Sequence, residues 1–254
     1  MAGVQIVGYE PGLQDQPASL EVAVDEQVRT RTLEPGERLD YGLKERHCAG
    51  VVEDGTHRSC SRSAAPYCDQ HTSVWACARC RGDCAMPLET CHEEHVVYLA
   101  AFEPRTAKVG VTRTWRLERR LAEQGARRGA RIRTVENGRQ ARQIEADMAA
   151  TFPDRITVDT KIDGLAADLD TGWWEQTIAP YDPDMRYRFD YGLDVDHRPI
   201  RETVATGSVR GSRGRLLLLD RGGTPYAVDL KDLVGYDVVR GGDDPDRQAS
   251  LRGF

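Results

Sequence analysis

Apolar and polar residues alternate in short stretches near both ends of the chain. Such stretches occupy residues 4–7, 19–24 and 27–33 near the N-terminus, and residues 185–191, 215–220 and 225–230 near the C-terminus. A period of two is typical of half-buried strands, and the glycine- and proline-containing segments between them supply turns. The pattern predicts a small antiparallel sheet at each end of the chain. We expect the C-terminal strands to form a small barrel or meander that can pair with the N-terminal sheet.

The middle of the chain combines strands with helices. Residues 97–100 and 107–112 are predicted strands around a turn at 103–105, and residues 117–124 and 138–148 are predicted helices. The second helix carries an apolar stripe at positions 141, 144, 148 and 152, which predicts packing against a sheet. Residues 157–170 are predicted to be turn-like. The paired Trp173 and Trp174 are interpreted as a hydrophobic plug rather than a platform for nucleic-acid bases.

The charge distribution indicates an anionic partner. The net charge is −6, but the segment from Arg113 to Arg142 contains ten Arg and three Glu, a local charge of +7, so the other residues carry −13. A basic segment in an acidic protein favours nucleic-acid binding over a merely solvated face. The expected phosphate contacts come from the following arginines: Arg113, Arg116, Arg120, Arg127 and Arg128. No apolar run is long enough to cross a membrane and no leader segment is evident, which predicts a cytoplasmic protein without a membrane partner.

All seven cysteines lie between Cys48 and Cys91. In a cytoplasmic protein this clustering favours metal binding over disulfides. The first predicted group contains Cys48, Cys60, Cys68 and His71, with His47 or His57 as substitutes for His71. The second contains Cys77, Cys80, Cys84 and Cys91, with His95 as an alternative ligand. Each group can fill the four positions of a closed zinc site, so we expect two structural zinc ions. An iron–sulfur cluster at the second group and a redox pair at Cys77 and Cys80 are the alternatives.

The order of elements from 97 to 149 resembles the GIY-YIG nuclease domain. The run Asn137-Gly-Arg-Gln-Ala-Arg-Gln-Ile-Glu145-Ala is similar to the Asn-x-Arg-x-Ala-x-x-x-Glu-Ala run on the metal-binding helix of excision-repair members of that group. The chain as a whole looks like the prokaryotic family called domain of unknown function 2797. The resemblance implies an α+β fold, in which a GIY-YIG-like core with a small antiparallel sheet and helices follows zinc-binding knuckles and is flanked by β segments.

Five consecutive segments follow from these patterns. They are an N-terminal β segment (1–46), a zinc-binding region (47–95), a GIY-YIG-like domain (96–156), a C-terminal β domain (157–240) and a disordered tail (241–254).

The resemblance also implies a set of catalytic residues. Glu145 matches the Glu that binds a divalent ion, Mg2+ or Mn2+, and Arg120 matches the Arg that holds the phosphate. Tyr98 matches the first motif tyrosine, which orients or deprotonates the attacking water. The second tyrosine is missing, because Lys108 stands where most active members have Tyr. A lysine can serve as a general base only if its pKa is lowered, although it can always contact phosphate as a point charge.

Three functions remain open at this stage. The first is a zinc-containing, metal-dependent endonuclease that acts on DNA or RNA. The presence of Tyr98, Arg120 and Glu145 favours it. The second is a non-catalytic protein that uses the same core to dock phosphates, which Lys108 favours. The third is a scaffold whose zinc knuckles bind another protein. No small-molecule cofactor is expected.

Overall fold

A computed structural model describes residues 3–72 and 92–241 of the chain. They form a mixed α+β protein with mostly antiparallel strands and few helices. The chain divides into two compact units, which are described separately below. The first combines residues 1–12, 16–72 and 200–254, and the second combines residues 13–15 and 73–199. No helix within 3–72 or 92–241 is both long and apolar enough to span a membrane.

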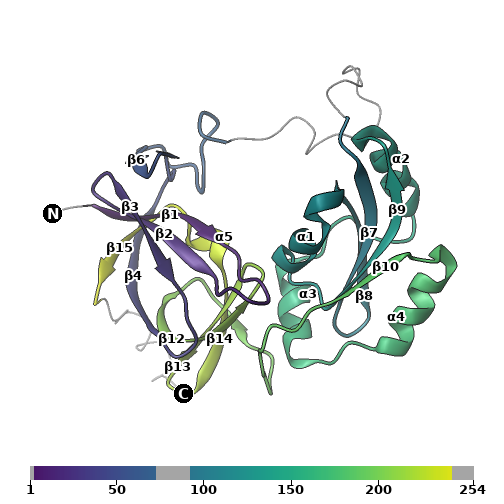
Figure 1. Ribbon diagram of the computed structural model, residues 1–254. Helices are drawn as coiled ribbons and strands as arrows, with labels where there is room; N and C mark the ends of the chain where they lie inside the picture. The colour runs from purple at the N-terminus through teal and green to yellow at the C-terminus, as the bar shows by residue number, and fades with distance from the viewer. Residues whose placement is uncertain (1–2, 73–91, 242–254) are drawn as a thin grey trace. The chain divides into compact units, whose positions relative to one another are not determined.

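The first unit is built on one long sheet in which both ends of the chain take part (Figure 1). The strand order is β11-β14-β13-β12-β4-β15-β1-β2-β3-β6-β5. The bounds are β1 (Val4–Glu10), β2 (Ser19–Val24), β3 (Gln27–Thr32), β4 (Arg38–Arg46), β5 (Val51–Glu53), β6 (Thr56–Arg58), β11 (Ile200–Arg201), β12 (Ala205–Arg213), β13 (Leu216–Arg221), β14 (Thr224–Asp229) and β15 (Tyr236–Arg240), with the short helix α5 (Leu230–Leu233).

The sheet of the first unit curls around a large apolar core, and a smaller apolar cluster of Val7, Ala23, Ala49 and Val234 lies beside it. Ile6 and Leu20 from the N-terminal strands pack together with Leu217, Leu219 and Val228 from the C-terminal strands, and all five are buried. Strand β15 pairs with both β1 and β4, so the last strand of the chain joins the first. The predicted pairing of the C-terminal strands with the N-terminal sheet is therefore confirmed.

The second unit is a four-stranded antiparallel sheet in the order β10-β9-β7-β8. Its strands are β7 (His95–Phe102), β8 (Thr106–Arg113), β9 (Arg128–Val135) and β10 (Met185–Arg188). Its helices are α1 (Leu117–Glu123), α2 (Gly138–Met148), α3 (Val158–Asp163) and α4 (Thr171–Ile178), with single 3-10 turns at Thr114–Arg116, Gly164–Ala166 and Ala179–Tyr181. The strands β7 and β8 and the helices α1 and α2 match the sequence prediction closely.

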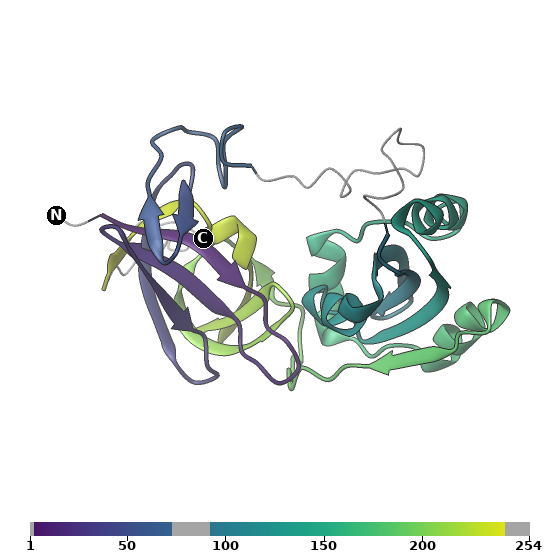
Figure 2. The same cartoon turned by 45° about the horizontal axis from the view of Figure 1, so that its top comes forward.

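Helices cover both faces of this sheet, as Figure 2 shows. On one face Leu99 of β7 packs with Met148 of α2 and Trp174 of α4. On the other face Tyr98 of β7 packs with Leu117 and Leu121 of α1. The helices α2, α3 and α4 each begin at a side-chain cap that accepts a hydrogen bond from a backbone N–H in the first turn, which stabilises a helix by about 1 kcal/mol.

Three features of the second unit differ from the prediction. Residues 158–163 and 171–178 are helices α3 and α4 rather than a turn-like stretch, since each is short but capped, and each buries an apolar residue, Ile162 or Trp174. Residues 128–135 form β9, a strand that the sequence pattern did not reveal because half of its eight residues are polar. Residues 185–188 pair with β9 rather than with the C-terminal β strands. Trp174 is buried and Trp173 is partly buried against the same core, in line with the predicted plug.

Gly110 of β8 leaves room for the Tyr98 side chain on the neighbouring strand. The two residues are directly opposed, and a Cβ atom at position 110 would lie 2.5 Å from the Tyr98 hydroxyl and 2.6 Å from Cζ. No real Cβ atom approaches another heavy atom so closely. Since Tyr98 is only 1% exposed, its ring has no free space into which it could move.

Replacing Gly110 by Ala is expected to destabilise the protein by about 1–3 kcal/mol, the usual effect of overpacking a well-packed core. Gly172→Ala is the matched control, because its Cβ would meet only Asp170 Oδ1, at an ordinary contact distance of 3.4 Å. Chemical denaturation of both variants measures the difference. Equal stability of the two variants would contradict the proposed packing of Tyr98 over Gly110.

Candidate metal centre and phosphate-handling cluster

Cys48, Cys60, Cys68 and His71 of the first unit bring their ligand atoms together. The three Sγ atoms and one ring nitrogen all lie within 4.8 Å of one another. His71 Nδ1 is 3.3 Å from Cys48 Sγ and 3.4 Å from Cys68 Sγ. Zinc–sulfur and zinc–nitrogen bonds of about 2.3 and 2.0 Å in a tetrahedron place sulfur and nitrogen roughly 3.5 Å apart. The four atoms therefore fit a zinc ion with His71 bound through Nδ1.

Backbone hydrogen bonds fix the loop that brings these ligands together. Cys48 follows strand β4 directly, and its backbone N–H donates to Arg62 O at 2.8 Å. The Cys68 carbonyl accepts from the N–H groups of both His71 and Thr72, which forms the turn that brings His71 back towards Cys68. Cys48 Sγ accepts from the backbone N–H groups of Gly50 and Cys68 at 3.4 and 3.3 Å. Such donors stabilise the thiolate form that binds metal.

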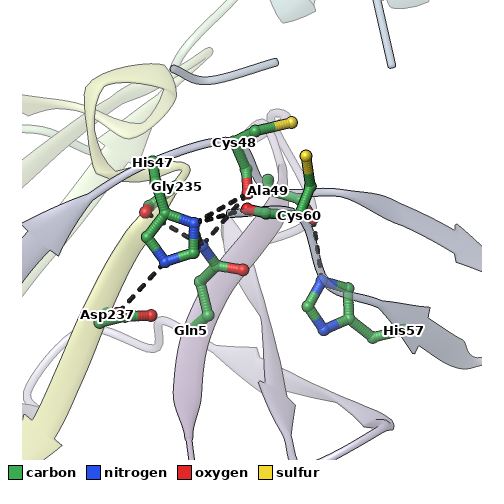
Figure 3. Close-up of polar contacts among 8 residues, drawn as sticks. All are labelled: Gln5, His47, Cys48, Ala49, His57, Cys60, Gly235 and Asp237. Atoms are coloured by element: carbon green, nitrogen blue, oxygen red, sulfur yellow. Dashed lines mark hydrogen bonds and ion pairs between the residues drawn. The ribbon is translucent and has the colours of Figure 1, made fainter. Parts of the chain in front are cut away.

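His47 and His57, the two alternative ligands, point elsewhere (Figure 3). His57 is buried and its Nε2 donates to Ala49 O at 2.9 Å. His47 Nδ1 lies 2.8 Å from Cys60 O and its Nε2 lies 3.2 Å from Asp237 Oδ2. The His47 ring thereby ties the backbone of a cysteine on the loop to strand β15. Burial alone would lower the pKa of His47, but the Cys60 carbonyl and the Asp237 carboxylate outweigh it and raise the pKa.

The Cys3His donor set suits a closed metal centre. With a metal bound, the four protein ligands would complete a tetrahedral shell and leave no open position for water or substrate. A metal such as zinc is compatible with the Cys3His donor set. Cys77, Cys80, Cys84 and Cys91, the second predicted group, lie outside the described residues. The alternative ligand His95 begins β7, where its Nδ1 contacts Glu93 O and its ring packs against Gly138 of α2.

In the second unit, the predicted residues Tyr98, Lys108, Arg120 and Glu145 belong to four different elements, β7, β8, α1 and α2. Tyr98 Oη accepts a hydrogen bond from Gln124 Nε2 at 2.6 Å. Burial raises the pKa of Tyr98, an effect that the Arg120 guanidinium and the Gln124 amide oppose. Glu145 also acts electrostatically on this phenol. The four side chains therefore form one cluster, here called the phosphate-handling cluster after the role that the family resemblance implies for it.

Lys108 differs from an ordinary surface lysine. It is half-buried, and its Nζ donates to Asp154 O at 2.7 Å. Burial, together with the Arg120 guanidinium, lowers the pKa of Lys108 to about 8, although Glu145 partly offsets the effect. A lysine with such a pKa has a substantial neutral fraction near neutral pH, and neutral amines can accept protons.

Glu145 is largely buried and already has a cationic partner. Its Oε2 lies 2.6 Å from the Arg142 guanidinium of the same helix, and the Glu145 side chain is 13% exposed. Sequence reasoning did not single out Arg142, nor did it assign a role to Gln124. Both are polar residues one helical turn from a residue that the family resemblance highlighted, and this spacing was the available indication.

Four of the five arginines predicted to contact nucleic acid have acidic partners. Arg113 pairs with Glu93 at 3.0 Å. Arg116 and Arg120 both pair with Glu123, at 3.4 and 3.3 Å. Arg127 pairs with the buried Glu103 at 3.0 Å. The local charge of +7 counted along the sequence is therefore partly neutralised in space, because acids such as Glu93 and Glu103 lie outside the segment over which it was counted.

Arg128, the fifth of these arginines, donates to Arg127 O at 3.0 Å. It opens strand β9, whereas Arg127 lies in the loop before it.

Substituting Cys68 by Ser is expected to remove about one equivalent of zinc per chain, because a closed site needs all four ligands. The thermal unfolding temperature should fall at the same time, since metal-binding energy contributes to folding. Ser59→Ala, next to Cys60 and exposed, is the matched control. Elemental analysis and thermal denaturation provide the measurements. An unchanged metal content in Cys68→Ser would show that this group of ligands does not hold the ion.

Comparison with known proteins gives a family but no characterised relative. No curated protein and no solved structure matches the chain at a significant level. A family model described as "Protein of unknown function (DUF2797)" matches residues 42–238, a range that includes the Cys3His cluster and the whole phosphate-handling cluster. Because this match covers well over half of the 254 residues, the chain belongs to the DUF2797 family.

Proposed function

We propose that this protein is a metal-dependent endonuclease of the GIY-YIG type, which hydrolyses phosphodiester bonds in DNA or RNA. The observation that carries the proposal is the convergence of Tyr98, Lys108, Arg120 and Glu145 from four elements. Each of these residues alone is an ordinary surface or core residue. Together they combine a carboxylate, a fixed cation and two proton-handling groups, the set that phosphodiester hydrolysis requires.

The roles follow from the chemistry of the side chains. Glu145 is suited to bind Mg2+ or Mn2+, which take carboxylate oxygens readily. When bound, such an ion polarises the phosphate and stabilises the charge that develops on it. Arg120 has a guanidinium fork that can hold two phosphate oxygens. Tyr98, held by Gln124, orients the water that attacks phosphorus. The water gives up a proton as its oxygen bonds to phosphorus and the bond to the leaving oxygen breaks.

Lys108 is the proposed acceptor of that proton, in place of the missing tyrosine. An amine with a pKa of about 8 has a larger fraction in its base form near neutral pH than a phenol, whose ordinary pKa is about 10. The hydrogen bond from Lys108 Nζ to Asp154 O fixes the position of the amine.

The Arg142–Glu145 ion pair places a condition on metal binding. A divalent ion has to compete with the Arg142 guanidinium for the Glu145 oxygens, since the two groups are only 2.6 Å apart. The arginine is 25% exposed and can turn outward to contact a bound phosphate.

A second candidate function is phosphate docking without cleavage. In the phosphate-handling cluster and its immediate surroundings, the cations Lys108, Arg120 and Arg142 lie among the carboxylates Glu123, Glu145 and Asp154. A lysine and two arginines can contact a phosphate through charge-assisted hydrogen bonds whether or not a metal is present. The zinc-binding unit would then stabilise a nucleic-acid-binding protein rather than a nuclease.

Glu145→Gln is expected to lower cleavage of single-stranded DNA, RNA or plasmid by about 100-fold or more, an order of magnitude typical for loss of a charged catalytic group. The amide cannot replace a carboxylate as ligand for the divalent ion. Asp147→Asn is the matched control, because it removes an exposed carboxylate from the same helix. Cleavage is measured with Mg2+ or Mn2+ and again with chelator. Equal cleavage by both variants would overturn the assignment of Glu145, and no cleavage by the unmodified protein would favour docking.

Lys108→Arg separates the two roles open to this residue. Arginine keeps the positive charge but remains protonated, so it can contact phosphate but cannot accept a proton. We expect nucleic-acid binding to stay within about twofold and cleavage to fall by about 10²–10⁴-fold, the usual contribution of a general base. Binding in chelator and cleavage in Mg2+ are compared for the same preparation. Full cleavage by Lys108→Arg would mean that position 108 acts through its charge alone.

A further inference from the structure

Arg128 of β9 and Arg188 of β10 lie directly opposite each other across the antiparallel strand pair. Side chains at opposed positions point to the same face of a sheet, with Cβ atoms about 4.5–5.5 Å apart. Arg188 is exposed and Arg128 is half-buried. Strand β10 is the outer strand of the four-stranded sheet, so this face is open along one edge.

Three neighbouring arginines, Arg127, Arg131 and Arg186, have acidic partners, but this pair does not. Arg127 pairs with Glu103 at 3.0 Å, and Arg131 pairs with Asp184 through two hydrogen bonds of 2.8 Å. Arg186, two residues before Arg188 on the same strand, pairs with Glu175 at 2.6 Å. Within residues 3–72 and 92–241, no carboxylate forms an ion pair with Arg128 or Arg188. The only hydrogen bond of the Arg128 side chain in this part of the chain is to Arg127 O, at 3.0 Å.

Two like charges at opposed positions destabilise a sheet. Partial burial of Arg128, together with the charges of Arg188 and Arg127, lowers the pKa of the Arg128 guanidinium, although Glu103 and Glu175 oppose this effect. The pairing of the two arginines is thus unfavourable in the free protein and becomes favourable once an anion lies between the two side chains. Guanidinium groups bind phosphate oxygens through paired, parallel hydrogen bonds, which two arginines at opposed positions can offer.

We propose that Arg128 and Arg188 form a clamp for a phosphate group of the nucleic-acid backbone. This inference rests on the proposed action on nucleic acid but not on cleavage. The contact is to phosphate and not to a base, so it positions DNA or RNA without reading its sequence. Arg188 comes from a segment far from the basic stretch 113–142, and the strand pairing brings it to Arg128.

A clamp and a structural pair predict opposite effects on stability. Arg188→Gln should leave the thermal unfolding temperature unchanged or raise it at low salt, because the repulsion with Arg128 is removed, and this gain should shrink as salt screens the charges. Arg186→Gln is the matched control, since it lies on the same strand and face but loses an ion pair with Glu175. That variant should unfold at a slightly lower temperature. A drop in Arg188→Gln equal to or greater than that in Arg186→Gln would overturn the clamp.

Binding is then measured in chelator, so that cleavage plays no part. The probes are a fluorescent RNA, the single-stranded DNA of the same sequence, and the matching DNA duplex, each across a salt series. Arg188→Gln should bind about tenfold more weakly at low salt, the order expected for one lost charge-assisted contact. The slope of log affinity against log salt should flatten by about one unit. Arg186→Gln should change both quantities much less.

Each outcome decides a separate point. Weakening confined to Arg188→Gln supports the clamp, and the probe that shows it identifies DNA or RNA as the ligand. Equal weakening in both variants, or no binding of any probe by the unmodified protein, overturns it. Binding that depends on Arg188 in a protein that cuts none of the probes with Mg2+ or Mn2+ would keep the clamp and reject the nuclease.

Discussion

The second unit depends on the double burial of strand β7. Residues 96–102 are all nearly inaccessible to solvent, and they alternate between two cores: Val97, Leu99 and Ala101 face α2 and α4, while the even-numbered residues face α1. Because side chains alternate with a period of two, a slip of one residue would exchange the two sets. Tyr98 would then leave the phosphate-handling cluster. The hydrophobic requirement of both cores thus holds the tyrosine beside Gln124 and Arg120.

Acidic side chains decide which basic residues of this unit remain available to a ligand. Glu123 alone gathers Arg116, Arg119 and Arg120, and Glu103 is buried against Arg127. An exposed ion pair contributes at most about 1 kcal/mol to stability, but an ion pair reduces the free positive charge whether it is exposed or buried. An arginine count along the sequence therefore overstates the positive charge that is free to meet a ligand. Arg128 and Arg188 have no ion-pair partner in the described part of the chain, so their charge is not reduced in this way.

The Cys3His cluster lies in a segment of the first unit that has little apolar core. Residues 48–72 contain only short strands, β5 and β6, and few buried apolar residues, so a packed core cannot hold this segment in one conformation. Four ligands around a metal ion would supply the missing constraint. His47 extends this constraint to the sheet, because its ring contacts both Cys60 O and Asp237 of β15. Strand β15 in turn pairs with β4 just before the first cysteine. The ligands and the sheet thereby support each other.

The local sequence pattern was sufficient to predict the elements that have a strong apolar periodicity, and the metal ligands that cluster in the sequence. The strands β1, β2, β7, β8, β13 and β14, the helices α1 and α2, and the ligand group from Cys48 to His71 all follow from short stretches of sequence. Helix α3 did not, because a six-residue helix is too short to display a period and is stabilised by its Thr157 cap and by the burial of Ile162. Strand β9 could not be predicted either, since three of its eight residues are arginines, which interrupt the apolar pattern of a strand.

What joins distant segments could be known only from the tertiary structure. In the sequence, the order of Tyr98, Arg120 and Glu145 resembles that of a known nuclease domain. The sequence did not show that the pKa of Lys108 falls to about 8, or that Arg142 forms an ion pair with Glu145. It determined that residues 185–188 form a strand, but not that Arg188 would lie opposite Arg128. Which strands pair depends on contacts between residues that are far apart in the sequence, because paired strands must bury their apolar residues in the same core. The charges that meet across such a pair are therefore not encoded by the spacing of either strand alone.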